Sequence, residues 1–260
     1  MVYNGEASIK MISKNRVGLA LACYDFCLKK MDNNISWKHV SRSLDENGYA
    51  LLKGVLNEST CKEFIAMYNN DTLYRSVIKM ERYRFGKGEY KYFNYPLPDA
   101  LSTMREKFYH QLAPIANGWM KMLSIDTEFP TKHHMLIDLC KTNQQMRPTP
   151  LILRYEAGGY NTLHQDLYGE VYFPFQVVFA LTQAGKDYTG GEFVLTEQVP
   201  RAQSKARVIS LDQGDALIFT TNFRPAKSTR GYYRATMKHG ISEVTGGVRY
   251  ALGLIFHDAT

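Results

Sequence analysis

The first part of the chain carries hydrophobic residues at helical spacing. Apolar positions recur on a rough helical period in residues 8–32 and 36–46, and most regularly in residues 101–123. The segment 48–54 is a short apolar run that predicts a buried strand, and capping residues from Asn57 onward predict a further helix. The first half of the chain is therefore expected to be mainly helical.

The helix predicted over residues 101–123 contains two residues that disfavour helical structure. Pro114 lacks a backbone donor and clashes with the preceding turn, and Gly118 adds conformational freedom. We expect the helix to be kinked or divided at these positions.

The second half changes to short runs rich in valine, isoleucine, phenylalanine and tyrosine, separated by glycine-containing turns. The predicted strands cover residues 151–155, 162–167, 175–181, 192–196, 207–211, 216–221, 235–244 and 248–257. About eight short strands at this spacing favour a sandwich or jelly roll over an α/β sheet. We therefore predict an α+β chain whose mostly β core is a jelly roll, the double-stranded β-helix of cupin-like proteins, flanked by helices. Residues 1–47 are expected to form a helical segment packed on the core, and residues 48–260 the jelly-roll domain.

Composition sets broad limits on the class of protein. The 260 residues are 45% hydrophobic and 22% charged, as in ordinary globular proteins. Four scattered cysteines form no CxxC pair, which argues against a zinc cage or redox dithiol and favours a reduced, cytoplasmic protein. The apolar run of residues 17–26 contains Asp25 and is too short to span a bilayer, so we expect no membrane association. A net charge of +7 is compatible with a polyanionic partner.

A histidine and an aspartate stand two residues apart in the β-rich half. On a strand, alternate side chains point to one face, so His164 and Asp166 can address the same point. His239, on a later predicted strand, would complete a set of two imidazoles and one carboxylate. That set suits a borderline metal such as Fe(II) and leaves three adjacent coordination positions open for a chelating co-substrate and O2. These three residues are the candidate metal ligands and catalytic centre.

Arg249 follows His239 by ten residues and is the candidate for binding a carboxylate. A planar guanidinium matches a carboxylate through two parallel hydrogen bonds. We expect the two residues on neighbouring strands of a hairpin that turns at Gly246-Gly247, facing one cavity. On such a hairpin their Cα atoms would be offset by roughly 20 Å, which sheet twist would have to shorten.

The pattern of HxD, a distal histidine and a basic residue ten positions later resembles the Fe(II)/2-oxoglutarate-dependent dioxygenase superfamily. More narrowly, three segments are similar to a bacterial AlkB-like oxygenase family labelled for oxidative demethylation of damaged nucleic acid. They are residues 147–150, 160–169 and 255–258. The resemblance runs from about residue 48 to the C-terminus and is sharpest from Leu151 onward.

The resemblance implies a role for each candidate residue. His164, Asp166 and His239 would hold Fe(II). Arg249, helped by the Tyr155 hydroxyl, would bind the distal carboxylate of 2-oxoglutarate. Decarboxylation of this co-substrate to succinate, driven by O2, would be coupled to hydroxylation or oxidative demethylation of a second substrate, an alkylated base in nucleic acid being one candidate.

Other functions stay open at this point. AlkB enzymes carry a second arginine six residues after the carboxylate-binding one, where this chain has Ile255, and the ten-residue spacing is more similar to prolyl hydroxylases. A prolyl-hydroxylase-like enzyme acting on a protein or a small molecule is therefore an alternative. A non-catalytic jelly-roll binding protein is another, against which the complete triad and Arg249 speak. A cupin-type isomerase or hydrolase would leave Arg249 unexplained.

Residues 81–95 interleave basic and aromatic side chains and are a candidate for contacting substrate. In one interpretation Arg82, Arg84 and Tyr90 lie at the mouth of the active site and bind nucleic acid. In the other, the segment is a hairpin with Tyr83 and Phe85 on its core face and both arginines in solvent.

Three further groups are weaker candidates. Arg230 belongs to a second basic segment and lies either in a substrate lid or in a solvated loop. His133 and His134 lack a suitable set of neighbouring metal ligands and are expected to form a surface pair. His257 and Asp258 end the last predicted strand and are expected to be structural.

Overall fold

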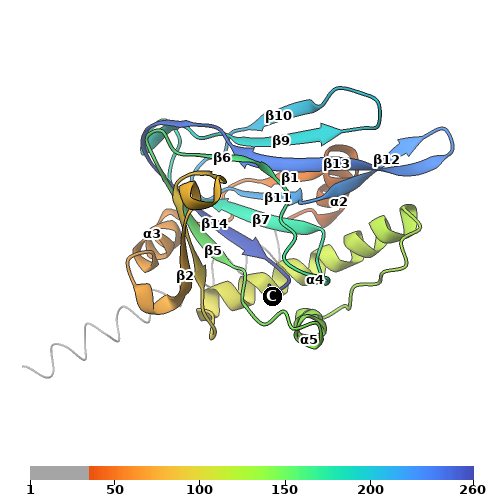
Figure 1. Ribbon diagram of the computed structural model, residues 1–260, viewed down its shortest axis with the longest axis horizontal. Helices are drawn as coiled ribbons and strands as arrows, with labels where there is room; N and C mark the ends of the chain where they lie inside the picture. The colour runs from red at the N-terminus through yellow and green to blue at the C-terminus, as the bar shows by residue number, and fades with distance from the viewer. Residues whose placement is uncertain (1–34) are drawn as a thin grey trace, which may run out of the picture.

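The computed structural model describes residues 35–260 as two facing antiparallel β-sheets with helices packed on the outer face of the larger sheet (Figure 1). The helix predicted over residues 8–32 lies outside the described residues. The described helices are α2 (Trp37–Asn47), α3 (Glu58–Met67), α4 (Asp99–Met122) and α5 (His133–Thr142), with short 3-10 helices η1 (Asp71–Leu73) and η2 (Met80–Tyr83). None of them is long and apolar enough to cross a bilayer.

The strands form an eight-stranded and a six-stranded sheet. The larger sheet has the order β1-β11-β7-β14-β5-β4-β2, with β8 paired to β14, and the smaller sheet has the order β10-β9-β13-β6-β3, with β12 paired to β13. The strands are β1 (Tyr49–Leu52), β2 (Tyr74–Lys79), β3 (Gly86–Lys87), β4 (Glu89–Phe93), β5 (Leu151–Glu156), β6 (Tyr160–His164), β7 (Phe175–Ala180), β8 (Tyr188–Gly190), β9 (Phe193–Gln198), β10 (Lys205–Ile209), β11 (Ala216–Thr220), β12 (Phe223–Ser228), β13 (Gly231–Ile241) and β14 (Val244–Ile255). The predicted jelly roll of short antiparallel strands is confirmed.

The larger sheet is buried on both faces because helices cover one side and the smaller sheet covers the other. Along β7, Phe175 and Phe179 pack toward the helices, whereas Val178 and Ala180 pack between the sheets. Every residue of β7 is buried, which explains why its sequence is apolar on both faces of the strand at all positions but one. The exception in that run is Gln176, which is polar and points into the space between the sheets.

Helix α4 passes through both Pro114 and Gly118 without a break, so the predicted division is wrong (Figure 1). Pro114 lies on the exposed side of the helix, where water can serve the carbonyl that proline leaves without an intrahelical donor. On the opposite side, Trp119 packs edge-on against Phe175 with ring centroids 4.6 Å apart. Packing on the sheet therefore outweighs the local cost of proline.

A buried ion pair ties α4 to the end of β14. The Arg105 guanidinium donates to Asp258 Oδ1 at 2.7 Å and to the Ile255 carbonyl at 2.8 Å, and Tyr95 donates to Asp258 Oδ2 at 2.8 Å. The side chains of Arg105 and Asp258 are 2% and 1% exposed. Asp258 and its neighbour His257, whose Nδ1 accepts from the Phe173 amide, therefore have structural roles, as predicted.

Replacing Arg105 alone should destabilise the fold strongly, because it leaves the Asp258 carboxylate buried without a counter-charge. We expect Arg105→Leu to lower the free energy of unfolding by about 3–5 kcal/mol, measured by urea denaturation. The double variant Arg105→Leu/Asp258→Leu, which removes both charges, should lose less stability than Arg105→Leu alone. A loss of under about 1 kcal/mol for Arg105→Leu, typical of a surface pair, would contradict the role assigned to this ion pair.

Candidate active site

Two histidines face each other across adjacent strands of the smaller sheet. His164, the last residue of β6, is registered directly opposite His239 of β13, and their rings lie 4.3 Å apart between centroids. Directly opposed residues of an antiparallel pair lie on the same face of the sheet, which here is the face toward the larger sheet. The strand register thus brings together two imidazoles that are 75 residues apart in the sequence.

Each imidazole is held in a different way. His164 Nδ1 donates to the Thr162 carbonyl at 2.7 Å, which leaves Nε2 free to act as a ligand atom. His239 is held by aromatic packing: Phe193 stacks parallel to it at 5.8 Å and Phe219 lies 4.7 Å away at a tilt. His239 Nδ1 is buried and has no hydrogen-bond partner among the described residues.

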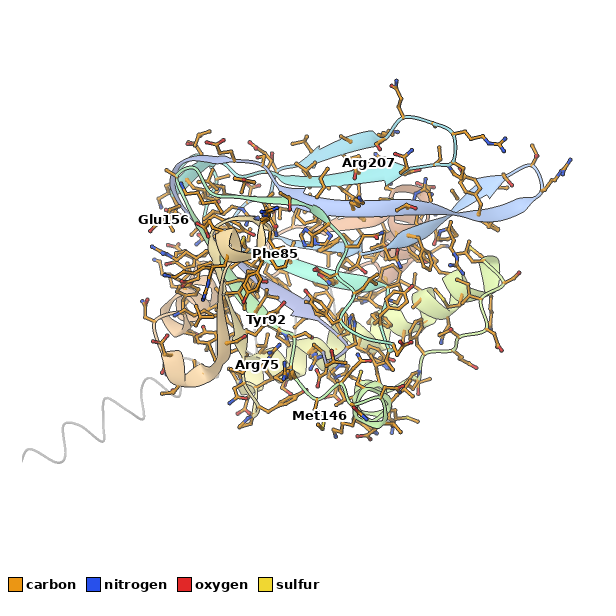
Figure 2. All side chains as sticks on the ribbon, viewed as in Figure 1. Arg75, Phe85, Tyr92, Met146, Glu156 and Arg207 are labelled. Carbon is orange, nitrogen blue, oxygen red and sulfur yellow. The ribbon has the colours of Figure 1, made fainter. Side chains whose placement is uncertain are left out.

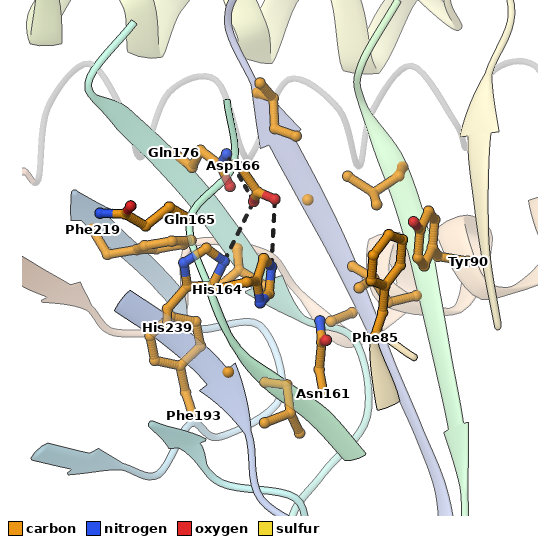
Figure 3. Close-up of a pocket in the computed structure, with 18 of the residues that line it drawn as sticks. Phe85, Tyr90, Asn161, His164, Gln165, Asp166, Gln176, Phe193, Phe219 and His239 are labelled. Carbon is orange, nitrogen blue, oxygen red and sulfur yellow. Dashed lines mark hydrogen bonds and ion pairs between the residues drawn. The ribbon is translucent and has the colours of Figure 1, made fainter. Parts of the chain in front are cut away.

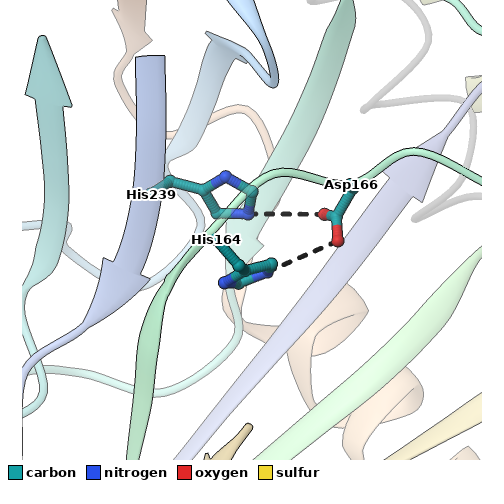
Figure 4. Close-up of side chains that lie close together, drawn as sticks. All are labelled: His164, Asp166 and His239. Atoms are coloured by element: carbon teal, nitrogen blue, oxygen red, sulfur yellow. Dashed lines mark ion pairs between the residues drawn. The ribbon is translucent and has the colours of Figure 1, made fainter. Parts of the chain in front are cut away.

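Asp166 completes the cluster from just beyond the end of β6. The strand was predicted to continue to residue 167 but ends at His164, so the carboxylate is placed by a loop and not by strand alternation. Asp166 Oδ1 lies 3.4 Å from His164 Nε2, and Oδ2 lies 3.4 Å from His239 Nε2 (Figure 4). One ligand atom from each of the three residues lies within 4.8 Å of the others, a spacing that can hold a metal ion.

Two further side chains fix the Asp166 carboxylate. Tyr168 donates its hydroxyl to Oδ1 at 2.9 Å, and Gln176 donates its amide to Oδ2 at 3.0 Å (Figure 3). Tyr92 in turn donates to the Tyr168 hydroxyl at 3.2 Å. None of these residues was predicted from the sequence to orient Asp166, although the single glutamine among the apolar residues of β7 was a usable signal.

The pKa values of the three residues are shifted by burial and by one another. Burial opposes ionisation of Asp166, but hydrogen bonds from His164 and His239 outweigh it and hold the pKa of this carboxyl well below its usual range. Burial and the charge of His164 lower the pKa of His239. His164 also loses solvation, yet its contact with Asp166 raises its pKa overall. The site is therefore built for a cation between the imidazoles and the carboxylate, a place that a divalent metal would take.

Arg249 faces the triad from the opposite sheet. It lies on β14 of the larger sheet, whereas His239 lies on β13 of the smaller one, so the predicted hairpin between them is wrong. The chain crosses from one sheet to the other at residues 242–243, before the glycines at 246 and 247. Packed sheets lie about 10 Å apart, and Arg249 therefore reaches the same cavity across this gap without the long offset expected along a hairpin.

The Arg249 guanidinium is buried without an ion pair among the described residues, although its charge adds to the Ser242 hydrogen bond in lowering the pKa of Glu192. The residue is 2% exposed, and within the described part of the chain its guanidinium forms neither an ion pair nor a hydrogen bond. It lies over the rings of Tyr155 and Tyr188 at 5.6 and 5.9 Å. The fully buried Tyr155 hydroxyl, next to Arg249 in register, also makes no hydrogen bond of ordinary geometry with a described residue. A buried cation and a hydroxyl donor, both unpaired, fit a ligand carboxylate.

A cavity of about 250 Å³ lies between the sheets and connects these groups. It is lined by the triad, Arg249, Tyr155 and Gln176, and also by Phe85, Tyr90, Tyr92 and Leu167. Phe85 and Leu167 are exposed and therefore mark its mouth. Figure 3 shows Phe85 and Tyr90 on the side of the cavity opposite His164 and His239.

The remaining candidates are divided between the mouth and distant surfaces. Arg82 and Arg84 are exposed on the turn next to Phe85, whereas Arg230 lies at the exposed tip of the β12–β13 hairpin and does not line the cavity. The hairpin interpretation with Tyr83 and Phe85 on a core face is wrong, because the rings are 52% and 46% exposed.

His133 and His134 do not form the predicted surface pair. His134 is exposed, but His133 lies on the inner face of α5, where it donates to the Phe256 carbonyl at 2.8 Å. Burial lowers the pKa of His133 to about 3. The sequence did not reveal α5, so the orientation of its first residue was missed.

Comparisons with known proteins agree with this geometry. The model of a family described as "Oxygenase, catalysing oxidative methylation of damaged DNA" matches residues 88–259. Uncharacterized proteins from two strains of Mycobacterium tuberculosis are each 43% identical to this chain over 167 residues, covering 64% of this chain and 72% of theirs.

Solved structures show the same fold. A prolyl-4-hydroxylase from Pseudomonas putida has a TM-score of 0.52 at 12% identity, over 86% of this chain and 100% of that chain. A prolyl hydroxylase from Trichoplax adhaerens, in complex with a hypoxia inducible factor peptide fragment, has a TM-score of 0.52 at 15% identity, over 89% of this chain and 92% of that chain. Because the family model spans most of the chain, this protein belongs to that oxygenase family, and its core is a jelly roll.

Proposed function

We propose that His164, Asp166 and His239 bind Fe(II), that Arg249 and Tyr155 bind the distal carboxylate of 2-oxoglutarate, and that the substrate is an alkylated base in nucleic acid. The observation that carries the proposal is the buried, unpaired Arg249 guanidinium facing the triad across one cavity. A binding protein or a metal hydrolase has no need for this second charged group.

The residues of the chain position the reactants. Two imidazoles and one carboxylate would hold Fe(II) and leave room on it for 2-oxoglutarate and O2. Bound Fe(II) and 2-oxoglutarate would supply the oxidising power: the co-substrate and O2 would yield succinate and CO2, and the second oxygen atom would enter a C–H bond of the substrate. Phe193 and Phe219 keep water from the back of His239, while Tyr168 and Gln176 orient the Asp166 carboxylate.

The family description, which names damaged DNA, supports a nucleic-acid substrate. Hydroxylation of a methyl group on a base nitrogen gives an unstable adduct that loses formaldehyde, so an oxygenase of this class can restore the unmodified base. The exposed Arg82 and Arg84 and the cavity-lining Tyr90 add charge and an aromatic surface where such a substrate would enter.

Removing the distal histidine should remove the metal. We expect His239→Ala to abolish iron-dependent succinate formation and to lose Mn(II) binding in an anaerobic titration, while circular dichroism shows a folded chain. His110→Ala, which removes an exposed histidine of α4, is the matched control. Normal succinate formation by His239→Ala would rule out the proposed triad.

Removing the Arg249 guanidinium should weaken only the binding of the co-substrate. Arg249→Ala should raise the concentration of 2-oxoglutarate that gives half-maximal succinate formation at least about tenfold, the loss of roughly 1.4 kcal/mol of a charge-assisted contact. Mn(II) affinity should change little, because Arg249 is not among the candidate ligands. Arg154→Ala serves as control, since Arg154 is the neighbour of Tyr155 and pairs with Glu156 outside the cavity. Equal half-saturation in Arg249→Ala and the unmodified protein would argue against 2-oxoglutarate binding at this residue.

The glutamine behind Asp166 should matter for metal affinity. Gln176→Leu keeps the size of the side chain but removes the donor to Oδ2, and we expect Mn(II) affinity to fall about 10- to 100-fold. Gln213→Leu also removes a partly buried glutamine hydrogen bond, to the Leu181 carbonyl away from the cavity, and should leave the affinity unchanged. If both variants bind Mn(II) equally well, Gln176 does not position the carboxylate.

A substrate screen separates nucleic acid from the alternatives. We expect the iron-loaded enzyme to release formaldehyde from methylated single-stranded oligonucleotides in step with succinate. The ten-residue spacing from His239 to Arg249 and the apolar Ile255 favour a prolyl-type hydroxylase instead. Succinate formation that responds to a proline-rich peptide and not to any methylated oligonucleotide would select that alternative.

A further inference from the structure

Two aromatic rings project from the turn that joins β2 to β3. Tyr83 ends the 3-10 helix η2, Arg84 adopts a left-handed conformation with φ of 59°, and Phe85 follows. The two rings stack on each other, with centroids 5.5 Å apart and planes at 19°. Their exposures of 52% and 46% are unusual for large rings in contact, which folded chains otherwise bury.

The turn is anchored at several points. Its base is the fully buried Met80, whose carbonyl accepts from the Phe85 amide at 3.2 Å. The Phe85 carbonyl accepts from both the amide and the hydroxyl of Thr162, each at 2.9 Å. At Gly86 the backbone approaches β6 so closely that a Cβ would lie 2.2 Å from the Tyr160 carbonyl oxygen. The exposed rings are therefore held on the strand that carries His164.

The stacked pair lies at the mouth of the active-site cavity. Phe85, labelled in Figure 2 together with Tyr92, lines the cavity and is 46% exposed. Leu167, which also lines the cavity, is 51% exposed and extends the apolar rim. The match to the oxygenase family begins at residue 88, so the turn lies outside the residues that the family model covers.

The charge around the rings is positive. Residues 79–87 contain four basic side chains and one acidic side chain, and all five are exposed. Within the described residues, neither Arg82 nor Arg84 forms an ion pair or a side-chain hydrogen bond. Their charges are available for a partner that carries negative charge at regular intervals.

We propose that the Tyr83–Phe85 pair is a stacking platform for a base adjacent to the target base of a single-stranded nucleic acid, with Arg82 and Arg84 on the backbone phosphates. The inference rests on the proposed function and narrows its substrate to an unpaired strand. A base can cover an exposed ring only after leaving its own stack, which a single strand permits at low cost. A proline-containing peptide could also cover the rings, but it would leave both guanidinium groups without a partner.

The test measures binding of a fluorescent 12-nucleotide oligothymidylate to the metal-free protein. Binding is detected by fluorescence anisotropy at several salt concentrations. We expect tighter binding of this single strand than of a 12-base-pair duplex, with affinity falling steeply as salt rises. Tyr83→Ala/Phe85→Ala should weaken binding at least about fivefold with the salt dependence unchanged. Arg82→Gln/Arg84→Gln should lower the slope of log affinity against log salt by about 1 to 1.5.

Control variants distinguish binding at this turn from a general effect of the protein's net charge. Lys205→Gln/Lys227→Gln removes two exposed charges from β10 and β12, and Tyr232→Ala removes an exposed ring from β13. Both should bind the oligothymidylate like the unmodified protein. Equal weakening in the lysine variant, or undiminished binding by Tyr83→Ala/Phe85→Ala, would overturn the platform.

Failure of the stacking platform can be distinguished from failure of the proposed reaction, because succinate formation without added substrate needs no nucleic acid bound at the turn. Absent oligothymidylate binding together with normal succinate formation would reject the platform and leave the oxygenase chemistry intact. If the unmodified, iron-loaded protein forms no succinate from 2-oxoglutarate, the proposed oxygenase reaction is rejected instead.

Discussion

The active site depends on one pairing between strands, the antiparallel register that sets His164 of β6 opposite His239 of β13. A slip of one residue would turn one imidazole to the outer face of the sheet and separate the pair. The register is constrained where the chains approach most closely: a Cβ at Gly240 would lie 2.6 Å from the Asn161 carbonyl oxygen. Since β13 is also paired with β9, both of its edges are fixed before any metal binds.

Two buried arginines show how the same side chain serves stability or function according to its partners. Arg105 has a complete set within the fold, with Asp258, a backbone carbonyl and Tyr95 around its guanidinium. Arg249 is equally buried but lies over two aromatic rings and forms no ion pair with a described residue. The first arrangement holds α4 against the end of β14. The second keeps a cation without an ion pair at the cavity, which suits the carboxylate of the proposed co-substrate.

Much of the fold could be predicted from the sequence because most strands have a recognisable local pattern of apolar and turn residues. Short apolar runs such as those of β7 and β11, separated by turn residues, predicted most strands to within a few residues. The spacing of His164, Asp166 and His239 identified the candidate metal-binding cluster. Apart from the missed helix α5 and the early end of β6, the errors concern contacts between distant segments. Nothing local shows that the chain changes sheets between His239 and Arg249, that α4 tolerates Pro114 because it packs on the sheet, or that Tyr83 and Phe85 face solvent.

The site can be tested most simply by a crystal structure of the protein grown without oxygen in Mn(II) and 2-oxoglutarate, with anomalous data for the metal. We expect one strong anomalous peak between His164 Nε2, Asp166 and His239 Nε2, and continuous density from it to a carboxylate paired with the Arg249 guanidinium. A peak at another position would rule out metal binding by the three residues, and 2-oxoglutarate bound without contact to Arg249 would rule out the role proposed for this arginine.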